Sequence, residues 1–136
     1  MKYVTYLIIL LSFTAIACKR KNPKTPDITP AFTPVGTWKW VLTTGGIAGV
    51  HQTPASTGHS LTYTFRADST ANILTDTSNV NTTYAIEHDT AFLTSGGVTD
   101  FLKVQGILLG IMSSHNDTMI ITQDFVDGFY FYYVKQ

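Results

Sequence analysis

The chain is poor in residues that several common protein classes require. Its 136 residues include one cysteine, which excludes an internal disulfide framework and a cysteine-rich zinc site. Basic and acidic side chains number nine each, so there is no excess of positive charge to neutralise nucleic-acid phosphates. Glu87 is the only glutamate, so one of the residues that favour exposed helix surfaces is nearly missing. The hydrophobic fraction of 44% argues against a disordered chain.

The formal net charge of zero is the sum of two unlike parts. Residues 1–34 carry five basic side chains and one acidic side chain, a net charge of +4. Residues 35–136 carry four basic and eight acidic side chains, a net charge of −4. This asymmetry indicates a basic N-terminal tract with a different role from the acidic domain that follows it.

Residues 1–17 have the pattern of an export signal. Lys2 gives a positive start, and the segment from Tyr3 to Ala17 contains no charge. As a helix this segment is about 22 Å long, which is short of the roughly 30 Å of a hydrocarbon core. The pattern therefore predicts a secretory signal peptide rather than a membrane span.

The end of this segment, Ala15-Ile16-Ala17-Cys18, resembles the lipobox of bacterial lipoproteins. The resemblance implies that the signal is cleaved before Cys18 and that this cysteine is acylated, which anchors the protein in a membrane of the cell envelope, facing the periplasm or the cell surface. The outer membrane is the expected site. The alternative is a small buried cysteine in an ordinary cleaved signal.

Residues 18–34 are expected to form a linker after the lipidated cysteine. Four of the five prolines fall there and recur every three or four residues, at positions 23, 26, 30 and 34. Proline at this density prevents a helix and favours an extended spacer of up to roughly 50 Å. The folded domain is expected to span residues 35–136.

The domain is predicted to be all-β. Thr, Tyr, Phe, Val and Ile are abundant, and short alternating runs are separated by turn residues. About eight strands at short intervals favour a small antiparallel up-and-down barrel, with a sandwich as the alternative architecture.

Several local features are expected within this domain. Trp38, Trp40 and Leu42 should share one face of the first strand, and His88-Asp89 should turn into a strand at residues 91–93. The apolar stretch at residues 98–112 fits either a buried strand or a helical turn. Residues 45–58 are too long for an ordinary hairpin loop and are expected to form a mobile flap.

Gly36-Thr37-Trp38 resembles the Gly-x-Trp signature on the first strand of lipocalins. This motif follows a lipobox and a proline-rich linker, and residues 124–133, near the end of the chain, read Asp-Phe-Val-Asp-Gly-Phe-Tyr-Phe-Tyr-Tyr. In this combination the chain is similar to small lipocalin-like lipoproteins of Bacteroidetes. The resemblance implies a lipocalin-like barrel in which Trp38, beside Gly36, packs across the closed end. It also implies that Lys135, where the family usually has arginine, lies over that tryptophan.

Alternation along the strands predicts an inward-facing set of large side chains. As a lining it would suit a small apolar or aromatic ligand, and the alternative is plain core packing. The set is Trp40, Tyr63, Phe65, Tyr84, Ile86, Phe129, Phe131 and Tyr133.

No catalytic, metal-binding or cofactor-binding residues are expected. The four histidines lack metal-ligand spacing, and the aspartates fall at predicted turns. We therefore expect a lipid-anchored envelope lipoprotein that is not an enzyme and that binds a small apolar ligand. The alternative is a filled barrel that acts as a protein-interaction or inhibitor module on an envelope protein. The expected partners of the protein are the membrane, through acylated Cys18, and either a small apolar ligand or an envelope protein. Nucleic acid is not an expected partner.

Overall fold

The described residues form nine β-strands and one short helix. A computed structural model describes residues 32–93 and 97–136. The predicted signal peptide, Cys18 and most of the predicted linker lie outside these residues. The described body begins at Phe32 and ends at Gln136.

The strands follow one another with short connections, and the helix is a single turn. In chain order the elements are β1 (Gly36–Gly45), β2 (Val50–Gln52), α2 (Pro54–Thr57), β3 (Leu61–Phe65), β4 (Thr70–Thr75), β5 (Asn79–Thr90), β6 (Val98–Val104), β7 (Ile107–His115), β8 (Thr118–Thr122) and β9 (Phe129–Lys135).

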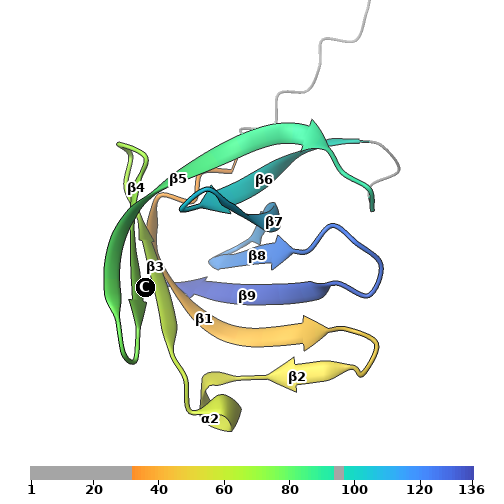
Figure 1. Cartoon of the computed structure of the whole chain (residues 1–136), viewed down its shortest axis with the longest axis horizontal. Helices are drawn as coiled ribbons and strands as arrows, with labels where there is room; N and C mark the ends of the chain where they lie inside the picture. The colour runs from red at the N-terminus through yellow and green to blue at the C-terminus, as the bar shows by residue number, and fades with distance from the viewer. Residues whose placement is uncertain (1–31, 94–96) are drawn as a thin grey trace, which may run out of the picture. The chain divides into compact units, whose positions relative to one another are not determined.

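These strands form one antiparallel sheet that closes on itself (Figure 1). The strand order is β2-β1-β3-β4-β5-β6-β7-β8-β9, and a further pairing between β1 and β9 completes the ring. Eight strands therefore make up the ring, and β2 adds to the second half of β1. The expectation of a small, barrel-like, antiparallel all-β fold is confirmed.

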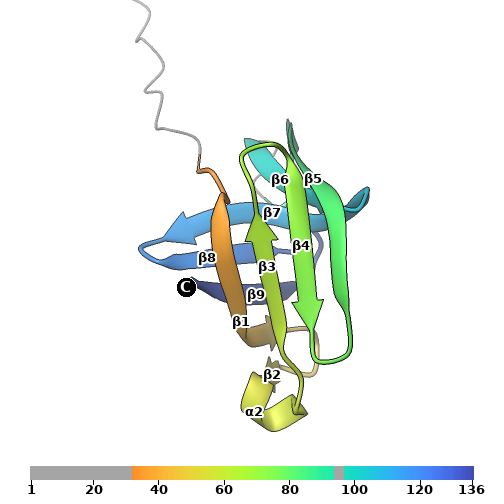
Figure 2. The ribbon, with the colours of Figure 1, turned by 90° about the vertical axis from the view of Figure 1, so that its left-hand side faces the viewer.

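The two longest strands change partner halfway along their length. Residues 36–39 of β1 pair with β3, whereas residues 43–45 pair with β2. Residues 79–83 of β5 pair with β4, and residues 84–90 pair with β6. Figure 2 shows β1, β3, β4 and β5 side by side, and Figure 1 shows the remaining strands that complete the ring. These two strands allow a single sheet to curve around an interior.

The inward face of β1 differs from the expected one in its second half. Pairing with β9 passes from Trp40 to Leu42 with a register shift, so Val41 is an extra residue on β1. A β-bulge of this kind reverses the alternation that follows it. Trp38 and Trp40 are both buried, as expected, but Thr43 takes the next buried position and Leu42 does not.

The expected turn at His88-Asp89 is wrong. β5 continues to Thr90, and His88 lies opposite Asp100 on β6, where His88 Nδ1 is 2.5 Å from Asp100 Oδ1. Contacts between directly opposite side chains stabilise continued strand pairing. The expected strand at residues 91–93 is a turn instead.

Residues 98–112 are neither one buried strand nor a helical turn. They contain β6 and the first part of β7, joined by a two-residue turn at Gln105-Gly106. The φ angles of Gln105 and Gly106 are 55° and 75°, as required for the tight turns that suit β-hairpins. Glutamine is unusual at the first position of such a turn, where asparagine, aspartate or glycine is preferred, so the sequence did not indicate it.

The segment at residues 45–58, expected to form a mobile flap, contains β2 and α2. Thr53 and Ser56 form a reciprocal capping box at the start of α2, and Pro54 occupies its first turn. Gly58 ends the helix in the left-handed conformation. The connection from β1 to β3 therefore contains a short strand paired with β1 and one capped helical turn.

The core is built from large side chains on the inner face of the ring. Phe65 is 1% exposed; its ring stacks on Tyr63 with centroids 5.5 Å apart and meets Tyr84 edge-on at 4.9 Å. The other fully buried large side chains include Trp38, Leu102, Met119 and Ile121.

Candidate ligand-binding pocket

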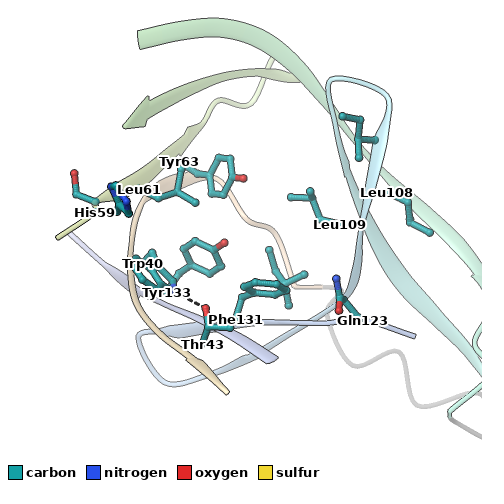
Figure 3. A pocket seen from close by; sticks show the side chains of 13 residues that line it. Trp40, Thr43, His59, Leu61, Tyr63, Leu108, Leu109, Gln123, Phe131 and Tyr133 are labelled. Carbon is teal, nitrogen blue, oxygen red and sulfur yellow. Dashed lines mark hydrogen bonds between the residues drawn. The ribbon is translucent and has the colours of Figure 1, made fainter. Parts of the chain in front are cut away.

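A pocket of about 510 Å³ lies among the inward-facing side chains (Figure 3). Its volume falls within the range of roughly 300–1,000 Å³ that is usual for small-molecule sites. Its thirteen lining residues are Trp40, Thr43, His59, Ser60, Leu61, Tyr63, Ile107, Leu108, Leu109, Ile121, Gln123, Phe131 and Tyr133.

Two facing walls give the pocket its apolar character. Aromatic rings from β1, β3 and β9 form one wall, and the first residues of β7 form the other. Figure 3 shows Leu109 across the pocket from Tyr63 and Tyr133. Ile107 and Leu108 are 63% and 52% exposed, so they belong to the rim.

The bulge in β1 brings a polar group into the aromatic wall. Thr43 is buried, and its hydroxyl oxygen accepts a hydrogen bond from the Trp40 indole N–H at 2.9 Å. A buried indole N–H without a partner is costly, so this bond stabilises the ring orientation of Trp40. The wall is therefore both apolar and fixed in position.

The phenols of Tyr63 and Tyr133 supply polar groups to the pocket. Their ring centroids are 5.6 Å apart, and both residues are buried. Burial raises the pKa of Tyr63, and burial together with the nearby Tyr63 raises the pKa of Tyr133 further. Both hydroxyls therefore remain protonated at neutral pH.

Gln123 follows β8 and is tied to the first residue of β9. Its backbone N–H donates to the Phe129 carbonyl oxygen, and its side-chain Oε1 accepts from the Phe129 N–H, both at 3.0 Å. These two bonds fix the orientation of the amide, and Figure 3 shows its nitrogen on the side of Leu109. The pocket thus has a further polar group on a rigid support.

His59 and Ser60 form a polar part of the pocket rim. The Asp76 carboxylate accepts the Ser60 backbone N–H at 2.9 and 3.0 Å, and it also accepts the Ser60 hydroxyl. His59 Nδ1 lies 3.3 Å from the same carboxylate. Hydrogen bonds from Ser60, followed by the contact with His59, lower the pKa of Asp76. The entry into β3 is therefore anchored to the end of β4.

Four of the eight residues predicted to line a cavity do so, namely Trp40, Tyr63, Phe131 and Tyr133. The other four lie elsewhere in the ring. Phe65, Tyr84 and Ile86 belong to the core or pack against it, and Phe129 lies near Phe131 with ring centroids 6.3 Å apart.

Sequence reasoning missed the opposite wall and the polar positions of the pocket. The hairpin of β6 and β7 was not predicted from the sequence, so Ile107, Leu108 and Leu109 were not assigned to the pocket. The bulge in β1 was not predicted either, so Thr43 was not expected on the inner face. Gln123 carried no signal in the sequence, because its role depends on the register between β8 and β9.

The residues given a barrel-closing role lie together at the start of β1. Lys135 Nζ is 5.5 Å from the centroid of the Trp38 ring, and Trp38 is 2% exposed. A Cβ at Gly36 would lie 3.1 Å from Lys135 Cε, so glycine leaves room for the lysine stem. The Trp38 indole N–H donates to the Pro34 carbonyl, and the Phe32 ring meets the indole edge-on at 5.8 Å.

Within residues 32–93 and 97–136, no group of three or more His, Cys, Asp or Glu side chains is placed to hold a metal ion. No helix in that part of the chain is long and apolar enough to cross a membrane.

Comparison with protein-family models, curated proteins and solved structures finds no match for this chain. The basis for a functional assignment is therefore the pocket itself, together with the sequence motifs.

Proposed function

We propose that residues 35–136 form a lipocalin-like domain that binds a small apolar molecule in the pocket, and that the protein is held at the cell envelope through acylated Cys18. The observation that carries the ligand-binding part is the 510 Å³ pocket between the aromatic wall and β7. The first-strand motif and the placement of Lys135 over Trp38 support the lipocalin-like description.

Burial of apolar surface supplies the binding energy in this proposal. A ligand that buries roughly 200 Å² of apolar surface gains about 5 kcal/mol, before the entropic cost of association is subtracted. The side chains that would provide the contact come from strands on both sides of the pocket. The ring of hydrogen-bonded strands holds them in place before the ligand arrives.

The alternative function, a protein-interaction or inhibitor module, is supported by a different observation. Phe92, Phe125 and Val126 are 70%, 52% and 66% exposed. The Asp124 carboxylate accepts the backbone N–H groups of Phe92 and Leu93 at 2.7 and 2.8 Å, which brings the two loops together. Exposed apolar side chains of this kind mark many protein-binding surfaces. Such a module requires no interior space, so the pocket favours ligand binding.

The test uses the neutral fluorescent probe N-phenylnaphthylamine, whose emission rises in an apolar site. The wild-type protein should bind it, and Leu109→Trp, which fills the pocket, should weaken binding by about tenfold or more. Leu74→Trp is the matched control, because Leu74 is exposed on β4 and does not line the pocket. Absence of probe binding to the wild type, or equal binding by both variants, would refute the proposal.

A further inference from the structure

The polar groups of the pocket indicate more about the ligand than its apolar walls do. Within the described residues, the hydroxyls of Tyr63 and Tyr133 have no hydrogen-bond partner. No fully buried side-chain oxygen or nitrogen lacks a partner in that part of the chain, so these two hydroxyls retain access to open space. Figure 3 shows both directed into the pocket.

Gln123 adds a donor to this pair. Its Oε1 is already engaged by the Phe129 N–H, so the group that remains for a ligand is the amide N–H₂. An amide nitrogen can only donate, and a protonated phenol is a stronger donor than acceptor. The three groups therefore match ligand atoms that accept hydrogen bonds.

Positive charge is missing from the described lining. None of the thirteen lining residues is lysine or arginine. His59 is at the rim with a side chain that is 80% exposed, and it already contacts the Asp76 carboxylate. A carboxylate or phosphate in the pocket would lose its hydration without gaining an opposite charge, which is strongly unfavourable.

We infer that the ligand is a neutral, mainly apolar molecule with one or more hydrogen-bond-accepting oxygens, such as ketone or ester carbonyls, that accept from donors among Tyr63, Tyr133 and Gln123. This inference rests on the proposed ligand-binding function and narrows it to one chemical class. Apolar contact supplies affinity, and the donors select for the oxygen and fix its position.

The test compares three naphthalenes whose substituents have nearly the same shape. Acetylnaphthalene carries a neutral acceptor, isopropylnaphthalene carries none, and naphthoate is an anion at neutral pH. Each competes with N-phenylnaphthylamine for the full-length protein. The ratio of the dissociation constant of acetylnaphthalene to that of isopropylnaphthalene is then measured for the wild type and for each variant. Comparing these ratios between proteins cancels the difference in hydrophobicity between the two compounds.

In the double variant Tyr63→Phe/Tyr133→Phe, acetylnaphthalene should bind about tenfold more weakly, while isopropylnaphthalene keeps its affinity. The two single variants should each show part of this loss. Gln123→Glu keeps an acceptor for the Phe129 N–H but replaces the donor, so it should weaken acetylnaphthalene selectively. Tyr132→Phe is the matched control, because Tyr132 does not line the pocket, and it should leave the ratio unchanged.

The possible outcomes separate this inference from the function on which it rests. An unchanged ratio in the double variant and in Gln123→Glu, with isopropylnaphthalene still bound, overturns the inference alone. The same holds if naphthoate binds the wild type as tightly as acetylnaphthalene. If none of the three compounds displaces the probe and the probe itself does not bind, the ligand-binding function fails as well.

Discussion

At the scale of single residues, the hydrogen bond between Trp40 and Thr43 contributes both to the stability of the fold and to the geometry of the pocket. Both side chains are buried and both line the pocket. The indole N–H needs an acceptor, and the bulge at Val41 places the threonine hydroxyl at 2.9 Å from it. The same irregularity that disturbs the sheet therefore satisfies the polar group of the aromatic wall.

The substitution Thr43→Val should destabilise the protein by about 1–3 kcal/mol, because it leaves a buried indole N–H without its acceptor while the volume is kept. Chemical denaturation measures this change. Thr43→Ser keeps the hydroxyl and should recover most of the loss. Thr44→Val, on the neighbouring position of the same strand, is the matched control. Equal stability of the Thr43→Val and Thr44→Val variants would contradict the role of this bond.

At the scale of elements, the β6–β7 hairpin decides where the second wall of the pocket lies. Pairing passes from Leu102↔Gly110 to Lys103↔Leu108, so β7 has an extra residue, Leu109, at a bulge. Gly110 has a φ of +146°, a conformation that favours glycine, and it lies against the backbone of Thr122. This glycine allows β7 to approach β8 while Leu109 faces the pocket.

Gly110→Ala should destabilise the protein by at least about 2 kcal/mol, because the new methyl group would overlap the Thr122 carbonyl in a strained backbone conformation. Gly106→Ala, in the turn of the same hairpin, meets no atom within 4 Å and should cost only about 1 kcal/mol, from its positive φ. Thermal unfolding of both variants measures the difference. A smaller effect at Gly110 than at Gly106 would be inconsistent with this packing.

The strands with regular alternation were predictable, and the irregular ones were not. Tyr63 and Phe65 on β3 alternate with threonines, and the buried face matches that pattern. On β1 and β7, one inserted residue reverses the face, and its position depends on pairing with strands far away in the sequence. The wall at residues 107–109 was missed for this reason. Only half of the predicted lining set reaches the pocket, because the other half packs elsewhere in the ring, namely Phe65, Tyr84, Ile86 and Phe129.

At the scale of the whole molecule, the proposal combines a membrane anchor with an acidic ligand-binding domain. The basic tract and the acidic domain have opposite net charges of +4 and −4. In this account the tract serves export and contact with the membrane surface, and the linker separates the domain from the bilayer.

Replacement of the single cysteine tests the anchor. Cys18→Ser should abolish incorporation of labelled palmitate and move the protein from the membrane fraction to the soluble fraction, since no other side chain in the sequence offers a thiol for the acyl group. Thr25→Ser, a conservative change in the linker, should retain both properties. Unchanged labelling of the Cys18→Ser variant would refute the anchor and leave the ligand-binding proposal intact.

The two tryptophans provide the most direct test of the ligand-binding claim. The Trp40 indole lines the pocket, whereas the Trp38 indole does not line it and donates to the Pro34 carbonyl. Addition of acetylnaphthalene to nitrogen-15-labelled protein should shift the Trp40 indole N–H signal in a saturable manner and leave that of Trp38 nearly unchanged. Two unchanged signals at high ligand concentration, or a shift confined to Trp38, would contradict the account.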